Sequence, residues 1–139
     1  MLIRLFDYPA DYPAVLSLWA NAGPGIQIRR SDEPEEIRKK LLRDPDLFLV
    51  AEENNQIIGS VLGGFDGRRG IVYHLAVSPE QRRKGIGEQL MAELEQRLRL
   101  KGCIRCYLLV TQDNLEAIQF YEARGWSCMD LFVYGKDLA

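Results

Sequence analysis

A short basic segment with two glycines is the part of this sequence best suited to chemistry on a bound ligand. It is the run Arg82-Arg83-Lys84-Gly85-Ile86-Gly87, which lies between a predicted strand and a predicted long helix. Glycine lets a ligand approach the backbone, a helix N-terminus carries partial positive charge, and basic side chains add full charges. These features predict a pyrophosphate-binding loop. An ordinary helix start beside a solvated basic run is the alternative interpretation.

Two common phosphate-binding motifs do not fit this loop. The Walker motif requires a glycine followed by Lys and then by Ser or Thr, and no such sequence occurs here. The dinucleotide-binding motif requires a third glycine at the position where Leu90 stands. A nucleoside-triphosphate P-loop is therefore excluded, and a Rossmann-type site is disfavoured.

The elements that must position the loop are a strand before it and a helix after it. Residues 71–77 form an apolar run that ends in Leu75-Ala76-Val77. Apolar residues then recur every three or four positions up to Gly102, which predicts a helix; they are Leu90, Met91, Leu94 and Leu98. Residues 103–110 follow as a second buried strand. This β-α-β order predicts two parallel strands.

The rest of the chain predicts a set of short elements in one domain, residues 1–139. We expect strands over residues 2–6, 47–52 and 56–63, helices over 11–20, 31–44 and 114–124, and one or two terminal strands over 126–137. The second helix has Asp32 and Glu35 at capping-box spacing and is expected to bury Ile37, Leu41 and Leu42. The predicted fold class is α+β, with a mixed, mainly antiparallel central sheet flanked by about four helices.

Composition excludes several classes of protein. The chain has 139 residues, 47% of them hydrophobic, and a formal net charge of −2, which is ordinary for a globular domain. There is no basic excess to neutralise a nucleic-acid backbone. The apolar runs are far shorter than the roughly 18 residues of a membrane-spanning helix, and no export segment is evident. We therefore expect a cytoplasmic protein with neither nucleic acid nor membrane as partner.

The cysteines and the single histidine do not predict a metal site. Cys103 and Cys106 have CxxC spacing, but they fall in the predicted strand 103–110, where residues three apart point to opposite faces. We expect packed thiols without chemistry at these positions and at Cys128. His74 has no clustered ligand set around it, so zinc is not expected.

Two motifs make the sequence resemble the GCN5-related N-acetyltransferases (GNAT family). The loop Arg82-Arg83-Lys84-Gly85-Ile86-Gly87 matches that family's acyl-CoA signature, an Arg or Gln with glycines three and five residues later, after a strand that ends like Leu75-Ala76-Val77. Residues 114–126 are similar to a second family element, which begins with Asn114, contains Phe120-Tyr121 and ends in Gly125-Trp126. The likeness is strong from about Phe48 onward and includes features of the small bacterial YpeA-type subgroup.

The resemblance implies a cofactor site residue by residue. Backbone amides from Arg82 through Gly87 would hold the pyrophosphate of acetyl-CoA, and the pantetheine arm would lie along Leu75, Ala76 and Val77. The strands 71–77 and 103–110 would splay apart to form a wedge for that arm. Asn114 would touch the pantetheine or adenosine side, and no metal is implied.

The resemblance also implies direct transfer of an acetyl group to an amine in a ternary complex. Tyr121 would be the acid that protonates the departing thiolate, and a strand amide such as that of Val77 would stabilise the oxyanion. No acid occupies a motif position that fixes a general base. Glu52, His74 and Asp66 are candidates by chemistry alone, with a structural role favoured for His74, and a water chain is a further route.

The acceptor is left open by the sequence. A small-molecule amine, a peptide α-amine and a lysine side chain are all compatible with the family, as is a homodimer. Residues that would line the acceptor side, or equally belong to core or surface, are Trp19, Arg29, Arg30 and Tyr134. The alternative function is a non-catalytic acyl-CoA sensor or interaction module, for which the hydroxyl group of Tyr121 would be dispensable.

Overall fold

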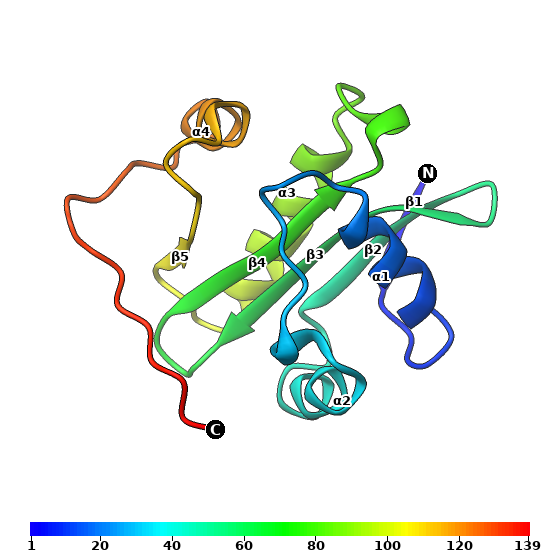
Figure 1. The fold of residues 1–139 in the computed structure, drawn as a ribbon, viewed down its shortest axis with the longest axis horizontal. Coiled ribbons are helices and arrows are strands. Elements are labelled where there is room, and N and C mark those ends of the chain that lie inside the picture. Colours follow the sequence, from blue (N-terminus) through cyan, green and yellow to red (C-terminus); the bar gives the residue numbers. More distant parts are fainter. The chain divides into compact units, whose positions relative to one another are not determined.

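A five-stranded sheet forms the centre of the computed structural model, which describes residues 1–139. Its strands lie side by side in chain order: β1 (Leu2–Leu5), β2 (Phe48–Glu53), β3 (Gln56–Phe65), β4 (Gly70–Val77) and β5 (Cys106–Leu108). The β1–β2, β2–β3 and β3–β4 pairs are antiparallel, whereas β4–β5 is parallel. The predicted mixed, mainly antiparallel sheet is confirmed (Figure 1).

The chain divides into two compact units, Met1–Leu109 and Val110–Ala139. The first unit contains the sheet and three helices, α1 (Tyr12–Ala20), α2 (Pro34–Arg43) and α3 (Ile86–Leu100). The second unit contains α4 (Leu115–Glu122). The four predicted helices are therefore all present. None of them is both long enough and apolar enough to span a membrane.

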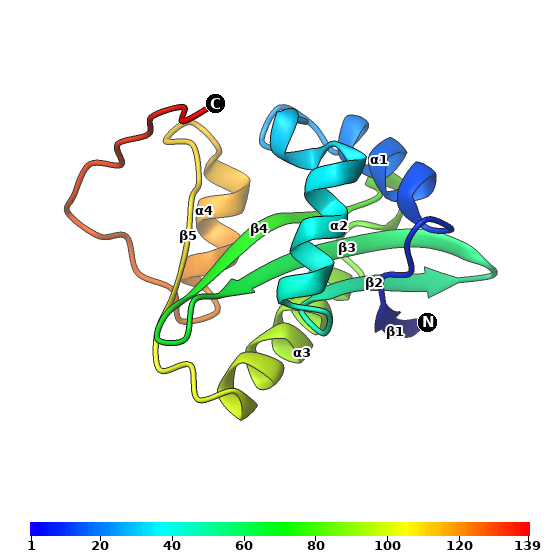
Figure 2. The same cartoon turned by 90° about the horizontal axis from the view of Figure 1, so that it is seen from below.

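Helices cover both faces of the sheet in the first unit. Figure 2 shows α1 and α2 on one face and α3 on the other. Strand alternation divides the core in the same way: Phe48 and Val50 of β2 belong to a buried cluster with Trp19 of α1. On the opposite face α3 packs so closely that a Cβ on Gly63 would lie 2.6 Å from a methyl carbon of Leu94. Near the start of α3, a Cβ on Gly59 would lie 3.1 Å from Ile86 Cγ2 and 3.3 Å from Ala76 O, so the beginning of this helix packs beside the end of β4.

The parallel pair β4–β5 is short, and the two strands then part. Its register runs from Gly70–Cys106 through Ile71–Tyr107 to Val72–Leu108, while β4 continues to Val77 without a partner on that side. We call the point after the Val72–Leu108 pair the fork. The predicted splayed strand pair is confirmed, and the unpaired edge of β4 beyond the fork offers backbone groups to a ligand.

Two local predictions about the second helix are wrong. Asp32 does not cap α2, because it lies in a 3₁₀ helix, Arg30–Asp32, where its carboxylate accepts the N–H of Arg29 (3.0 Å). Glu33 takes the N-cap position without a side-chain hydrogen bond. Leu42 is 87% exposed rather than buried, because α2 turns only its Ile37 face fully into the core.

The strand predicted over residues 103–110 is shorter than expected, which changes the relation between its cysteines. Only Cys106–Leu108 is extended, and Cys103 belongs to the turn that ends α3, where its N–H donates to the carbonyl of Leu98 (3.0 Å). The Sγ of Cys103 and the Cβ of Cys106 each lie 3.1 Å from the place of a Cβ on Gly70. The prediction that the two side chains point to opposite faces of one strand is therefore wrong, and both thiols are free.

The terminal strands predicted over residues 126–137 are absent. This segment is irregular, and its large apolar side chains are exposed, with Phe132 at 87% and Tyr134 at 91%. An apolar segment forms a stable strand only where a neighbouring strand pairs with its backbone. The second unit contains no strand, so the pattern has no partner within it.

Candidate functional site

The loop between β4 and α3 presents a row of unpaired backbone N–H groups. After a 3₁₀ turn, Pro79–Gln81, the backbone takes positive φ at Arg83 (64°) and Gly85 (79°). No hydrogen-bond partner in the protein engages the N–H groups of Arg83, Lys84 or Gly85, and the first intrahelical bond runs from Gln89 N–H to Gly85 O (3.1 Å). The N–H groups of Ile86 and Gly87, at the start of α3, likewise lack an intrahelical partner. The row is a concave site for an anion.

Two of the three basic side chains of the loop make hydrogen bonds within the protein, and the third is exposed. Arg82 donates through Nε to Val77 O (3.3 Å) and through an η nitrogen to Ala22 O (2.7 Å), so it ties the loop to the end of β4 and to the segment after α1. Lys84 donates to the side-chain oxygen of Gln81 (3.0 Å). Arg83 is exposed and has no partner, so its charge is free to meet a ligand.

A β-bulge interrupts β4 just past the fork. In its register with β3, Ser60 pairs with Ala76 and Leu62 pairs with Tyr73, so one residue of β3 faces two residues of β4. His74 takes the extra place with a left-handed backbone, φ 46°. The bulge turns Tyr73 and His74 toward the same face of the sheet. It also breaks the ladder between β3 and β4 at the place where β4 has lost its partner on the other side.

His74 is held by a buried carboxylate that the sequence did not reveal as its partner. Its Nε2 lies 3.0 Å from both oxygens of Asp32, a residue 4% exposed, and its ring packs on Trp19 with centroids 4.7 Å apart. Asp32 and His74 are 42 positions apart, and no local signal links them. Of the three candidate bases, His74 alone lies on the strand beside the fork.

The other two candidate bases have structural partners. Glu52 accepts a hydrogen bond from Nε of Arg4 (3.2 Å), at the opposite side of the sheet. Asp66 lies in the turn between β3 and β4, where one carboxylate oxygen accepts the N–H groups of Arg68 and Arg69, both at 2.8 Å. These bonds hold the pKa of Asp66 below its usual value, which makes it a weak proton acceptor.

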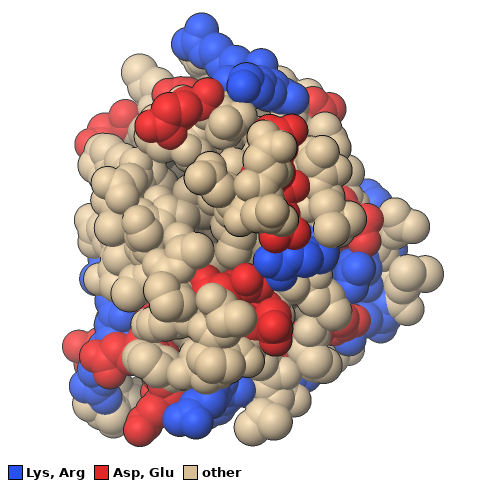
Figure 3. Space-filling model, turned by 90° about the vertical axis from the view of Figure 1, so that its right-hand side faces the viewer, with Lys and Arg blue, Asp and Glu red and all other residues tan.

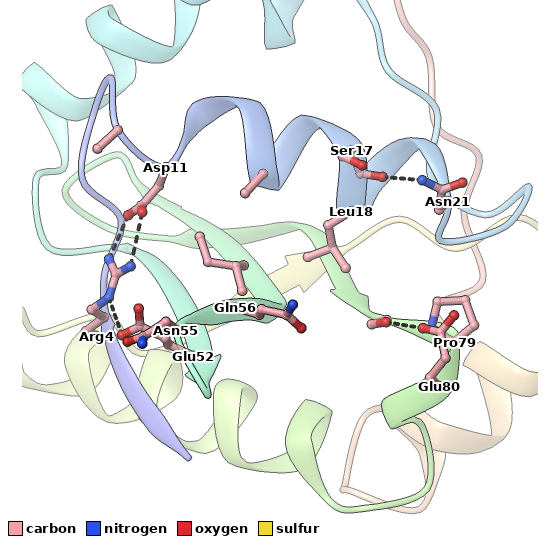
Figure 4. A pocket seen from close by; sticks show the side chains of 14 residues that line it. Arg4, Asp11, Ser17, Leu18, Asn21, Glu52, Asn55, Gln56, Pro79 and Glu80 are labelled. Atoms are coloured by element: carbon pink, nitrogen blue, oxygen red, sulfur yellow. Dashed lines mark hydrogen bonds and ion pairs between the residues drawn. The ribbon is translucent and has the colours of Figure 1, made fainter.

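A groove of about 690 Å³ lies between α1, the β2–β3 hairpin and residues 78–80, which begin the loop after β4. Figure 3 shows acidic side chains along the middle of this face, and a separate group of basic side chains at its upper edge. In Figure 4, Arg4 stands between Asp11 and Glu52, with its two η nitrogens 2.6 and 3.0 Å from the carboxylate oxygens of Asp11. The carboxylates of Asp11 and Glu52 are thus already paired with Arg4.

In the second unit, Asn114 and Tyr121 have clear local roles. The side-chain oxygen of Asn114 accepts the N–H of Ala117 (3.2 Å), which caps the start of α4. Tyr121 is half-buried on α4 against Phe120 and Trp126, with ring centroids 5.2 and 6.0 Å away. Burial raises the pKa of Tyr121 to about 12, so its hydroxyl group is protonated at neutral pH.

Trp19 does not line an acceptor site. It is 1% exposed, stacks with Phe48, and donates its indole N–H to Ser60 Oγ (3.0 Å), which makes it a core residue. Arg29 donates to the side-chain oxygen of Gln27 (2.6 Å) on the surface, Arg30 is exposed beside it, and Tyr134 belongs to the second unit.

Comparison with known proteins gives consistent matches over the whole chain. Residues 12–126 match the model of the acetyltransferase (GNAT) family. An acetyltransferase of Pectobacterium atrosepticum is 42% identical over 99% of this chain and 96% of its own length. An uncharacterised N-acetyltransferase of Yersinia pestis is 40% identical with the same coverage of both chains.

Solved structures show the same fold. The PaiA N-acetyltransferase of Thermoplasma acidophilum, solved in complex with coenzyme A, has a TM-score of 0.80 at 22% identity and covers 95% of this chain and 94% of its own. Naa20 of Chaetomium thermophilum, in complex with a bisubstrate analogue, has a TM-score of 0.78 at 27% identity and covers 91% of this chain and 71% of its own.

Proposed function

Because this chain belongs to the GNAT family of acetyltransferases and is an N-acetyltransferase, we propose that it transfers the acetyl group of acetyl-CoA to a primary amine by direct attack in a ternary complex. The observation that carries this proposal is the row of unpaired N–H groups at Arg83, Lys84 and Gly85, at the end of a strand whose outer edge is unpaired. The coenzyme A bound to the PaiA structure, which has the same fold, supports this donor.

Each part of the donor has a matching feature in the first unit. The pyrophosphate would accept hydrogen bonds from the N–H row and meet the free charge of Arg83. The pantetheine arm carries amide groups, and these would pair with the free edge of β4 along Leu75, Ala76 and Val77 as an additional strand does. An arm that starts at the loop and follows β4 in this way brings the thioester to the fork.

The transfer step needs a polarised carbonyl, a neutral amine and a protonated leaving group. The amine nitrogen forms a bond to the thioester carbon, and a backbone N–H on the unpaired edge of β4 near the fork stabilises the oxyanion. When the tetrahedral intermediate collapses, the C–S bond breaks and Tyr121 donates its proton to the sulfur. The proton lost by the amine passes to His74 or to water, and Tyr121 is reprotonated from solvent.

The test is thiol release from acetyl-CoA in the presence of a panel of amines, amino acids and peptides, with Tyr121→Phe and Tyr8→Phe assayed in parallel. Tyr8 is a matched control because it is also a partly buried tyrosine but packs against the core beside α1. We expect acceptor-dependent release whose kcat falls at least about tenfold in Tyr121→Phe, with unchanged affinity for acetyl-CoA. Binding of acetyl-CoA without release for any acceptor would contradict catalysis. Absence of binding would contradict the proposed donor.

A further inference from the structure

A second groove, of about 640 Å³, opens on the α2 side of the sheet beside the fork. We call it the α2 groove; the residues that define it here are Arg43, Gly64, Arg69, Ile71, Tyr73 and Tyr107. Ile71 and Tyr107 are partners in the parallel ladder, one pair before it ends. The groove therefore reaches the place where β4 and β5 separate. Its α2 residues place it on the face of the sheet that carries α2, and Figure 2 shows α3 on the opposite face.

The floor of the α2 groove is flat and largely apolar. Tyr73 is 41% exposed. Its partial burial raises the pKa of its hydroxyl group, so the side chain is neutral. A Cβ on Gly64 would lie 3.1 Å from Lys40 Nζ, 3.2 Å from Ile71 Cγ2 and 3.8 Å from the Tyr73 ring, so the absence of a side chain at Gly64 keeps this part of the floor open. The exposed ring of Tyr73 and the partly buried ring of Tyr107 suit an apolar or aromatic body.

The rim of the α2 groove carries two guanidinium groups, those of Arg43 and Arg69, without a carboxylate at ion-pair distance. Lys39 pairs with Glu36, and Lys40 pairs with Asp44. The Asp66 carboxylate accepts two backbone N–H groups and also interacts electrostatically with Arg69. Arg43 uses one η nitrogen for Phe65 O (3.1 Å), and Arg69 lies over the Tyr107 ring, 5.8 Å from its centroid. Both retain donors for an anion, and both would repel a polycation.

We infer that the α2 groove binds the acetyl acceptor, and that this acceptor is an amine with an aromatic or apolar body and a carboxylate. The inference rests on the proposed function, because the donor's thioester must reach the fork. The carboxylate pairs with Arg43 and Arg69, the body lies on Tyr73 and Tyr107, and the amine points toward the fork. Donor and acceptor then meet there from different directions, as direct transfer requires.

Two isosteric amines test the charge requirement. The probes are para-(aminoethyl)benzoate and para-(aminoethyl)benzamide, which share the amine, the ring and the shape and differ in the anionic group. We expect kcat/KM for the benzoate to exceed that for the benzamide by about tenfold, the ratio typical of one charge-assisted contact. Spermidine, a polycation, should be a poorer acceptor than either probe. Equal rates for the two probes, or preference for spermidine, would overturn the inference.

Substitution of the two rim arginines tests whether the preference for the benzoate arises in the α2 groove. Arg43→Gln and Arg69→Gln should each lower the benzoate-to-benzamide ratio toward one, mainly by raising KM for the benzoate. Arg68→Gln is the matched control, since it removes an exposed arginine next in sequence to Arg69 that does not line the groove. Melting temperatures establish that all three variants fold. An unchanged ratio in both groove variants would place the acceptor elsewhere.

A binding measurement separates this inference from the proposed function. Calorimetric titration of para-(aminoethyl)benzoate into wild-type protein, with coenzyme A present, needs no turnover. Binding that Arg43→Gln weakens, in a protein that releases no thiol, would support the groove and contradict the proposed transfer. Thiol release with some other amine, without binding of the benzoate, would support the transfer and overturn the inference.

Discussion

Replacement of Gly85 by alanine separates the folding role of the loop from its role in binding acetyl-CoA. Gly85 has φ 79°, and a Cβ built on it would meet only Gln89 Nε2, at 4.0 Å, so the protein itself has room for the methyl group. The expected cost to folding is therefore the left-handed penalty of an alanine, about 1–2 kcal/mol. A pyrophosphate held by the N–H row would lie where the added methyl group projects.

Gly102 provides the matched control at the other end of α3. It also has a positive φ, 87°, and nothing lies within 4 Å of its Cβ position. Gly102→Ala should lose about the same stability, which for a domain of this size lowers the melting temperature by about 3 °C per kcal/mol. It should leave the affinity for acetyl-CoA unchanged, because it is remote from the loop in sequence and caps the opposite end of the helix.

Thermal unfolding with and without acetyl-CoA measures both effects together. With ligand at a hundred times the wild-type Kd, binding stabilises the wild type and Gly102→Ala by about 2.7 kcal/mol. If Gly85→Ala binds tenfold more weakly, the same concentration stabilises it by about 1.4 kcal/mol. The ligand-induced shift would then be about 8 °C in the control and about 4 °C in Gly85→Ala. Equal shifts in the two alanine variants would refute close approach of the ligand to this backbone.

Two further predictions concern stability. Arg4 lowers the pKa of Asp11 by donating hydrogen bonds to its carboxylate. The pair therefore stabilises the fold above the ordinary aspartate pKa, and this contribution is lost as the pH falls through the lowered pKa. Urea titrations should show Asp11→Asn less stable than wild type by about 1–3 kcal/mol at pH 7, and this difference in stability should close below about pH 4. Asp32→Asn should lower the free energy of unfolding by about 1–3 kcal/mol, because it disturbs the hydrogen bonds with Arg29 N–H and His74. The matched control Glu33→Gln changes an exposed neighbour and should leave the stability almost unchanged. Equal losses of stability in these two variants would contradict a structural role for the Asp32 carboxylate.

The sequence predicted those parts of the fold that depend on local periodicity. The apolar spacing of Leu90, Leu94 and Leu98 defined α3, and all three side chains are buried. The hairpin of β2 and β3 and the parallel return to β5 followed from turn residues and from the β-α-β order. The sequence also indicated the loop between β4 and α3 as a candidate anion site, because its glycines and basic residues are consecutive in the chain.

The errors arose where a distant partner decides the local structure. Asp32 has the spacing of a capping residue, but its carboxylate binds Arg29 N–H and His74, which lies 42 positions away. Residues 126–137 include the apolar run Leu131-Phe132-Val133-Tyr134, which is typical of a strand, yet their own unit contains no strand to pair with them. The sequence left Trp19 open between the acceptor side and the core, and the structure places it in the core, where its indole N–H donates to Ser60. Single-sequence patterns carry no information on such pairings.

The bulge in β4 also depends on a partner distant in sequence, and it changes which side chains lie beside the fork. A regular strand would turn Tyr73 and His74 to opposite faces of the sheet. The left-handed backbone at His74 turns both to one face, where His74 meets Asp32 and Tyr73 lines the α2 groove. A left-handed conformation at a non-glycine residue costs free energy, and the contacts of His74 with Asp32 and Trp19 offset that cost. We therefore assign His74 first a positioning role: it holds the distorted strand beside the fork, where the donor and acceptor are proposed to meet.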